Sequence, residues 1–304
     1  MNMHQTMPEF RAGGTDLSER RRSGVSRGQI VDLTPTDTMT GIAWGQDGAA
    51  RIGAMVTIET LASDARVRNA YLGLAGAAAS LATPQIRSVG TLGGNLAQRS
   101  RCWYFRNPHL ACLKKGGPVC PARAGNHLYG VAFDLGPCVA PHPSTLAAAL
   151  LAYEATVTTN ERSGLTISEL LGDGSDGTVD HKLKPGEYII HVDIRPPLEG
   201  EHAGYHRVIS RTYAEWPLVE AVVRVVLVGK RFEFVRVTAG GIGPVPLRFI
   251  EVEETLRSST SEEASIRQAA ALSAKNAKPL SGTTYKLKLL QQEIVDLVQS
   301  LIAH

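Results

Sequence analysis

Four cysteines lie within 37 residues of one another and could share a ligand: Cys102, Cys112, Cys120 and Cys138. Cysteines that only pack in a core would be scattered, and a cytosolic chain would not usually hold these as disulfides. The intervals between them are nine, seven and seventeen residues. Structural zinc sites usually contain a Cys pair two to four residues apart. Four thiolates spread over a loop suit a cubane cluster instead, with zinc and free thiols as the alternatives.

Two Gly-Gly pairs could bind phosphate, because a residue without a β-carbon lets backbone N–H groups approach an anion closely. Gly13-Gly14 is followed by Thr15 and Asp16, and Gly93-Gly94 lies between Thr91 and Asn95. Two such turns could converge on one pyrophosphate, and two tight turns without a ligand are the alternative. Neither pair fits the G-x-G-x-x-G fingerprint of a Rossmann site or the phosphate loop of P-loop proteins.

The elements that must position these residues alternate between helices and strands in the first two thirds of the chain. We expect helices at residues 17–25, 67–82 and 146–153, with Thr57 and Ser144 as N-caps and Pro84 as a helix stop. Residues 89–96 read as a glycine turn, and residues 102–138 as a loop held by something other than a core. Strands are expected at 29–33, 50–58, 155–159 and 187–194.

The pattern changes after Pro197, where strand-length runs follow one another. We expect strands at 205–211, 218–228 and 232–239, of which the second could also be a helix running into a strand. Helices are expected at 251–256, 261–274 and 285–304. This C-terminal part therefore reads as a smaller α+β domain.

The composition indicates a soluble globular protein of two domains. The chain has 304 residues, of which 43% are hydrophobic and 20% charged, and its net charge is +3. No strong field points to nucleic acid or to an anionic membrane. No segment approaches the ~20 apolar residues that span a bilayer. The sequence therefore predicts a cytoplasmic protein, or a periplasmic one if a partner with an export signal carries it out.

An ordered series of motifs resembles the flavin-binding subunits of molybdenum hydroxylases, the family of xanthine dehydrogenase and carbon monoxide dehydrogenase. The series begins with AGGTDL (12–17), TLGGNLA (91–97) and HPST (142–145), and continues with GGIGPVPLR (240–248) and PLSGTTYKLKL (279–289). The resemblance implies an α+β (α/β) protein. Its FAD-binding part, residues 1–198, would have two subdomains of the vanillyl-alcohol-oxidase/PCMH type. A C-terminal α+β domain of the carbon monoxide dehydrogenase flavoprotein type, residues 199–304, would follow.

The resemblance also implies which residues bind FAD. The two glycine loops would hold the pyrophosphate, and Ser144 would lie near the adenosine. The implied residues of the loops are Ala12, Gly13, Gly14, Thr15, Asp16, Thr91, Gly93, Gly94 and Asn95. The chain departs from the family at Thr145, where Asp is usual, because a hydroxyl brings no charge to hold the dinucleotide. It also has eleven residues before Ala12, where the family usually has a further strand–helix–strand unit.

The cysteine segment resembles a subset of this family, which includes a periplasmic aldehyde oxidoreductase and the 4-hydroxybenzoyl-CoA reductases. The similar stretches are RCWYFRN (101–107), GGPVCPA (116–122) and GPC (136–138). In that subset an inserted loop, here about residues 100–139, carries a [4Fe–4S] cluster. The resemblance implies Cys102, Cys112, Cys120 and Cys138 as its ligands.

The function implied is that of an oxidoreductase subunit in a heterotrimer. A large molybdopterin-binding subunit would oxidise an aldehyde or an aromatic or N-heterocyclic substrate, and a small [2Fe–2S] subunit would relay electrons to FAD on this chain. An external acceptor would then take them. We name no catalytic acid or base, because the chain would place and tune a cofactor. The alternatives are a free-standing flavin oxidase with a zinc-stabilised loop and a scaffold subunit without flavin.

Overall fold

A five-stranded antiparallel sheet organises the N-terminal two thirds of the chain, in the order β3-β4-β7-β5-β6. The computed structural model describes residues 8–212 and 214–303. The central strands β4 and β7 carry the apolar residues Ile52 and Val192, which are completely buried. The strands are β3 (Ile42–Trp44), β4 (Ala50–Gly53), β5 (Thr156–Thr159), β6 (Leu165–Thr166) and β7 (Ile189–Ile194).

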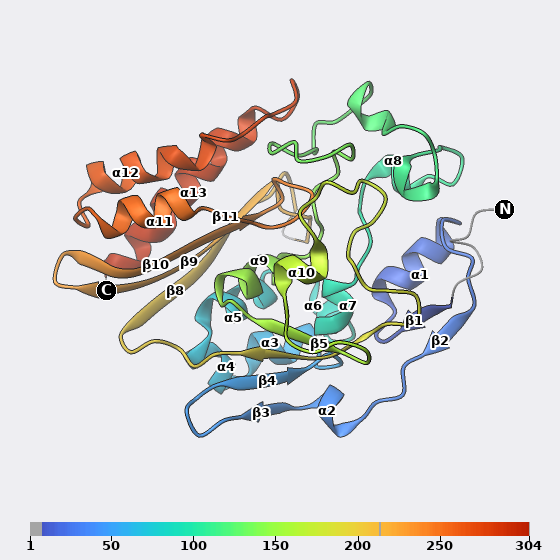
Figure 1. Ribbon diagram of the computed structural model, residues 1–304, viewed down its shortest axis with the longest axis horizontal. Helices are drawn as coiled ribbons and strands as arrows, with labels where there is room; N and C mark the ends of the chain where they lie inside the picture. The colour runs from blue at the N-terminus through green and yellow to red at the C-terminus, as the bar shows by residue number, and fades with distance from the viewer. Residues whose placement is uncertain (1–7, 213, 304) are drawn as a thin grey trace.

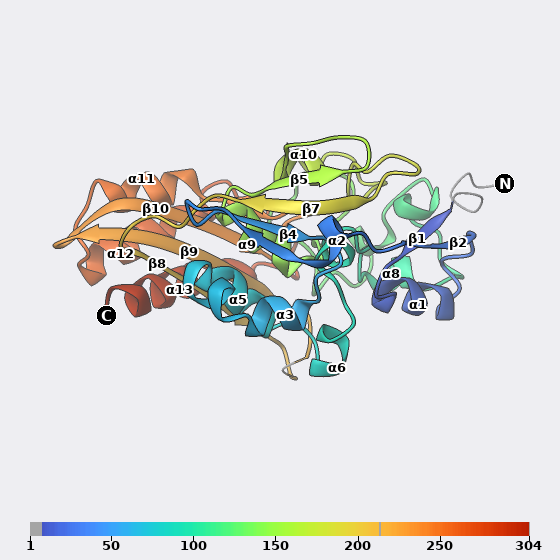
Figure 2. The same ribbon diagram turned by 90° about the horizontal axis from the view of Figure 1, so that it is seen from below.

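Short helices rich in alanine and leucine fill the space between this sheet and the C-terminal domain (Figure 2). Helices α5 and α9 contact each other, and both also contact strands of the C-terminal sheet. Their small side chains allow this close approach on more than one side. The helices of this part are α2 (Asp37–Thr40), α3 (Ile58–Ser63), α4 (Ala65–Ala70), α5 (Leu72–Ala79), α6 (Pro84–Arg87), α9 (Thr145–Ala152) and α10 (Ile167–Leu171).

The C-terminal domain is a four-stranded antiparallel sheet, in the order β11-β10-β9-β8, with three helices on one face (Figure 1). Helix α13 packs on β8 and β9, and α11 packs on β10. A second core fills the space between them. The elements are β8 (Glu201–Val208), β9 (Val219–Val228), β10 (Arg231–Gly240), β11 (Leu247–Arg248), α11 (Ile250–Arg257), α12 (Glu263–Ala271), η4 (Leu272–Ala274) and α13 (Tyr285–Ile302).

The predicted cofactor residues lie at the edge of this scaffold, where regular structure is sparse. A parallel pair of strands, β1 (Glu9–Arg11) and β2 (Ile30–Asp32), flanks helix α1 (Thr15–Arg22). Helix α7 (Leu92–Leu96) carries the second Gly-Gly pair. The cysteine loop, residues 102–138, contains only α8 (Trp103–Arg106), η2 (Leu113–Lys115) and η3 (Pro121–Arg123).

Most predicted elements are present, and three predictions were wrong. Residues 67–82 form two helices, because the backbone leaves the helical region at Tyr71, whose hydroxyl donates to the carbonyls of Gly48 and Arg195. Pro84 begins α6 instead of ending a helix, since Pro is tolerated at the first helical position. The second Gly-Gly pair lies inside α7 and not in a turn.

The ambiguous run at residues 218–228 is a strand from Val219 to Val228. Its first seven residues are all buried. Helices α9 and α13 both contact β9, so most of the strand has a covered surface on either side. A strand in this position loses the alternation of polar and apolar residues that would mark it in the sequence.

Candidate cofactor sites

The two glycine loops, residues 12–16 and 89–95, lie against each other. A Cβ on Gly13 would overlap the carbonyl oxygen of Val89 and would stand 3.3 Å from the Cα of Gly90. Thr15 lies near the same backbone segment, because its hydroxyl is 3.6 Å from the place that a Cβ on Gly90 would occupy. The structure therefore brings together two turns that are about eighty residues apart in the sequence. Gly13 is needed for this backbone-to-backbone contact itself.

The first glycine loop, which Ala12 begins, presents the N-terminus of helix α1. Gly14 is the N-cap in a left-handed conformation, with φ of 71°, which suits glycine. No side chain caps this helix end. The first N–H groups of a helix have no partner within the helix, and together with the helix dipole they favour an anion. This end of α1 can therefore accept a phosphate without displacing a side chain.

The second glycine loop is held by caps. The Thr91 hydroxyl accepts a hydrogen bond from Gly94 N–H at 3.1 Å and so begins α7. Asn95 is buried, and the Ser144 hydroxyl donates to its side-chain oxygen at 2.6 Å. Ser144 also accepts from Ala147 N–H as the N-cap of α9, as predicted. The HPST motif and the second glycine loop are thus one hydrogen-bonded unit.

Gly93 and Gly94 differ in what surrounds them. A Cβ on Gly93 would stand 2.8 Å from the Cβ of Ala54, so Gly93 allows α7 to pack on the chain beyond β4. A Cβ on Gly94 would meet only the Thr91 hydroxyl, at 2.9 Å. Gly94 therefore leaves an open approach at the first turn of α7, whereas Gly93 is enclosed by the protein.

Asp16 is engaged by two arginines of the segment that follows α7 and by one of its own helix, α1. Its carboxylate pairs with Arg106 at 2.7 Å, Arg101 at 2.9 Å and Arg20 at 3.0 Å. It also accepts from the backbone N–H of Arg99 at 3.2 Å. Burial opposes its ionisation, but these arginines outweigh burial and lower the pKa of Asp16. Asp16 joins the first glycine loop to the start of the cysteine loop.

Thr145 lies beneath the surface, in the first turn of α9, with 1% of its area exposed. Its hydroxyl neighbours Tyr205 and Glu220 of the C-terminal sheet. These two residues share a hydrogen bond of 2.8 Å. Burial raises the pKa of Glu220 and favours its neutral form. Thr145 therefore faces the contact between the two domains.

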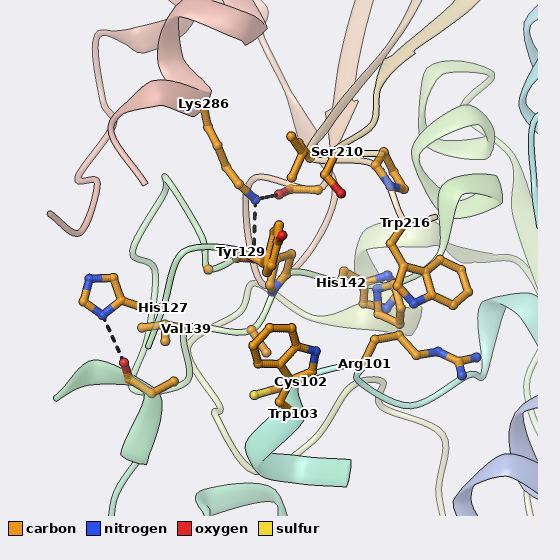
Figure 3. Close-up of a pocket in the computed structure, with 18 of the residues that line it drawn as sticks. Arg101, Cys102, Trp103, His127, Tyr129, Val139, His142, Ser210, Trp216 and Lys286 are labelled. Carbon is orange, nitrogen blue, oxygen red and sulfur yellow. Dashed lines mark hydrogen bonds between the residues drawn. The ribbon is translucent and has the colours of Figure 1, made fainter. Parts of the chain in front are cut away.

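A cavity of about 290 Å³ opens between the cysteine loop and the C-terminal domain (Figure 3). This is close to the lower end of the roughly 300–1,000 Å³ of small-molecule pockets. Its walls include the aromatic rings of Trp103, Tyr129 and Trp216. Arg101 lines it as well, and its guanidinium lies 4.7 Å from the centre of the Trp216 ring. Since Arg101 also pairs with Asp16, this cavity adjoins the glycine loops.

Two further ionisable residues, which the sequence analysis did not single out, line this cavity. Lys286 of α13 is 1% exposed, and its ammonium donates to the carbonyls of Gly241 at 2.7 Å and Tyr129 at 3.4 Å. Burial lowers the pKa of Lys286 to about 7. His142 is buried too, and burial lowers its pKa to about 4. Lys286 precedes the buried Leu290 and Ile294 at intervals of four residues and so lies on the same side of α13. This spacing could have identified Lys286 as a buried residue from the sequence.

The four cysteines lie in one neighbourhood. A hydrogen bond between the thiols of Cys120 and Cys138 lowers the pKa of Cys120 and raises that of Cys138, whereas burial raises the pKa of Cys102 and of Cys112. Cys102 is near enough to Cys120 and Cys112 to interact with both electrostatically. Within residues 8–212 and 214–303, however, no three or more His, Cys, Asp or Glu side chains are gathered so as to hold a metal ion. The shared site thus stays a prediction.

Charged side chains hold the cysteine loop to the rest of the molecule. Lys114 is buried and pairs with Asp180 at 2.9 Å, and Arg99 pairs with the other oxygen of the same carboxylate at 2.6 Å. Although burial opposes its ionisation, these two cations hold the pKa of Asp180 well below its usual range. The loop's own apolar cluster has three buried members, Ala122, Val131 and Val139. Lys114 is therefore already paired with a carboxylate.

Known proteins match the whole length of this arrangement. Residues 4–197 match the family described as the FAD binding domain in molybdopterin dehydrogenase, and residues 205–300 match the CO dehydrogenase flavoprotein C-terminal domain. The chain is 31% identical to the aldehyde oxidoreductase FAD-binding subunit PaoB of Escherichia coli strain K12. That alignment covers 95% of this chain and 90% of PaoB.

Solved structures share the fold. Quinoline 2-oxidoreductase from Pseudomonas putida 86 has a chain with a TM-score of 0.74 and 19% identity, covering 97% of this chain and 89% of that one. Carbon monoxide dehydrogenase from Hydrogenophaga pseudoflava has one with a TM-score of 0.75 and 18% identity, covering 97% and 90%. Over residues 8–212 and 214–303, no helix combines the length and the apolar character needed to cross a membrane.

Proposed function

Because the chain belongs to the family of FAD-binding subunits of molybdenum hydroxylases, we propose that it is the electron-transfer subunit of a heterotrimeric enzyme of this kind. It would bind one FAD and one [4Fe–4S] cluster. Its partners would be a large molybdopterin-binding subunit, on which the substrate is oxidised, and a small [2Fe–2S] subunit. FAD, when bound, would supply a site at which electrons from these partners are collected and passed to an external acceptor.

The observation that carries the flavin part of this proposal is the contact between the two glycine loops. The uncapped N-terminus of α1 and the open side of Gly94 belong to these two loops. Backbone N–H groups in such an arrangement favour a pyrophosphate. The residues present therefore fit FAD, with Ala12, Gly13, Gly14 and Thr15 on one side and Thr91, Gly93, Gly94 and Asn95 on the other.

The remaining predicted FAD residues would act indirectly. Asp16 is occupied by arginines and would fix the shape of the first glycine loop. Ser144 would orient Asn95 through their hydrogen bond. Thr145 would support the contact of the two domains. We propose the boundary between the domains at residues 198 and 199, which is supported by the two sheets, β3-β4-β7-β5-β6 before it and β11-β10-β9-β8 after it.

The donor set supports an iron–sulfur cluster in the cysteine loop. Four thiols in one neighbourhood are the ligands that such clusters use. Cys102, Cys112, Cys120 and Cys138 would be its ligands.

We also propose an aldehyde as the substrate of the complex, supported by the likeness to an aldehyde oxidoreductase subunit, with aromatic or N-heterocyclic substrates as the second candidate.

Replacing Gly94 with valine tests the flavin site. Within the protein the Cβ would meet only the Thr91 hydroxyl, at 2.9 Å, which must shift slightly, so the larger steric conflict would be with a phosphate. We expect the purified Gly94→Val complex to lose at least nine tenths of its FAD, measured after release by denaturation, while its iron content and far-UV circular dichroism stay unchanged. Full FAD occupancy would contradict the assignment of the second glycine loop.

The absorption spectrum and metal content of the anaerobically purified complex test the alternatives. The proposal predicts FAD, and iron and acid-labile sulfide in excess of what the small subunit contains. Flavin with one zinc on this chain would instead favour a zinc-stabilised loop, and turnover by this chain alone would favour a free-standing oxidase. Absence of flavin would leave a scaffold subunit.

A further inference from the structure

Lys286 is the most unusual charged group in the cavity between the two domains. Helix α13 is amphipathic, and Lys286 stands on its buried side with 1% of its area exposed. Transferring an ammonium from water to the protein interior is costly unless it is paired. Its ammonium donates to two backbone carbonyls, those of Gly241 and Tyr129. Carbonyl dipoles stabilise a cation only in part, so this position carries a cost that some function must offset.

The other cations of the cavity are paired. Arg101 has Asp16 and Glu19 as partners, and Arg211 has Glu215 at 3.4 Å. Lys286 is the one lysine or arginine lining the cavity that has no carboxylate partner in the part of the chain that the structure describes. Glu220 lines the same cavity, but burial raises its pKa and Tyr205 holds it by a hydrogen bond. At and below about pH 7, where Lys286 carries its proton, the cavity therefore offers one uncompensated positive charge.

An aromatic cavity with one uncompensated cation fits a planar ring system that gains negative charge when it is reduced. The rings of Trp103, Tyr129 and Trp216 form the apolar part of the walls, and Lys286 enters from the side of the C-terminal domain (Figure 3). Arg101 joins this cavity to the first glycine loop. A dinucleotide whose pyrophosphate lies on the glycine loops could thus extend its flavin ring into the cavity.

We propose that Lys286 contacts the pyrimidine end of the flavin ring and stabilises its reduced, anionic form. This inference rests on the proposed function. When the isoalloxazine takes up two electrons from the redox centres of the partner subunits and one proton from solvent, it gains one net negative charge. That charge is concentrated at N1 and the C2 oxygen. An ammonium beside these atoms binds the reduced ring more strongly than the neutral oxidised ring, and so raises the reduction potential.

The ammonium also has a second, local role that the test must separate. By donating to Gly241 and Tyr129, it ties α13 to the loop between β10 and β11 and to the cysteine loop. Loss of those bonds would lower the thermal stability of the protein. It would leave the relative stability of oxidised and reduced flavin unchanged, unless Lys286 faces the ring.

The experiment is a potentiometric titration of the flavin in the assembled complex, with FAD content measured first. Lys286→Gln retains a donor for the carbonyls and removes the charge. We expect it to keep its FAD and to favour reduced flavin about tenfold less than the wild type. This corresponds to a two-electron potential lower by about 30 mV. Lys286→Arg, which keeps the charge, should stay near the wild-type potential. Lys288→Gln, an exposed position on the same helix, should match the wild type.

The outcomes separate this inference from the proposed function. Wild-type complex without FAD would overturn the proposed function. FAD-loaded Lys286→Gln with an unchanged potential would overturn the role of Lys286 alone, as would equal falls in Lys286→Gln and Lys286→Arg. Should Lys286→Gln not fold, Lys286→Met places an apolar chain on the apolar stripe of α13, and its potential decides the question in the same way.

Discussion

The two glycine loops are held by backbone contacts and helix caps, whereas the cysteine loop, residues 102–138, is held by charged side chains. At the glycine loops, Gly13 packs on the backbone of Val89 and Thr91 caps α7. In the cysteine loop, Lys114 pairs with Asp180, and Arg123 pairs with Asp134 at 2.6 Å. The first region is held by contacts within the protein itself. The second has only a small apolar cluster of its own, although Ala132 and Phe133 near its end join the core of the C-terminal domain.

This difference indicates how each region should respond to its ligand. Loops that are already held in place, such as the two glycine loops, lose little conformational entropy when a ligand binds. A loop without a core gains much of its order from whatever joins its distant parts, so metal binding and loop folding should be coupled. Surface ion pairs add little to stability, and the pair between Arg123 and Asp134 is partly exposed. The buried pair of Lys114 and Asp180 is the firmer attachment.

The largest expected effect follows from removing one cysteine. Cys120→Ser should abolish the iron and sulfide carried by this chain and should make residues 102–138 sensitive to limited proteolysis. FAD content should fall less, because the proposed pyrophosphate contacts, on the two glycine loops, lie outside this loop. Val119→Ser changes the exposed neighbour of Cys120 and serves as the control. Iron and sulfide at the wild-type level in Cys120→Ser would argue against the shared site.

Adding one methyl group to the first glycine loop should test how rigidly the loops are joined. Gly13→Ala would drive a Cβ into the Val89 carbonyl, and overpacking of this kind should cost about 3 kcal/mol in the free energy of unfolding. Gly14→Ala adds the same atom where φ is 71° and should cost about 1 kcal/mol. Urea unfolding of both variants measures the difference. Equal costs would mean that the two loops can separate.

The junction between the two regions should show an intermediate effect. Arg106 is mostly buried and pairs with Asp16 and Glu19 of α1. Arg106→Met keeps the apolar length and removes the charge, and should destabilise the protein by about 2 kcal/mol, since it leaves a buried carboxylate with fewer partners. Arg22→Met is the control, because Arg22 is exposed and belongs to α1, the helix that carries Asp16 and Glu19. If both variants unfold alike, the pairing of Arg106 with Asp16 and Glu19 does not join the first glycine loop to the cysteine loop.

The smallest effect concerns pH. The pKa of Asp16 is lower in the folded protein than its ordinary value of about 3.9. Its ionised form therefore stabilises the fold above about pH 4, and this contribution fades as the pH falls through the folded value. Asp16→Asn should be less stable than the wild type by about 1 kcal/mol at pH 7, and the gap should narrow as the pH falls below about 4. Thermal unfolding of both proteins along this pH range measures it. A gap that stays constant would show that the charge is not what matters.

Much of the local structure could be predicted from the sequence. Thr57 and Ser144 precede helices and cap them as predicted, because a cap depends on residues within one turn. The strand β7 and helix α13 follow from apolar patterns of the expected length. Residues 67–82 break into two helices instead, since Tyr71 finds its partners at Gly48 and Arg195. These partners are distant in the sequence, and no local pattern announces them.

The sequence by itself determined which residues could do chemistry: two glycine pairs, four clustered cysteines and a series of motifs in order. These are properties of residue type and spacing. Only the tertiary structure decided that Gly13 meets Val89, that Asp16 is occupied by arginines, and that Lys286 reaches the same cavity as Trp103. The reason is physical. Such contacts join segments tens to nearly two hundred residues apart, and which side chains share a cavity depends on how the two sheets and their helices pack.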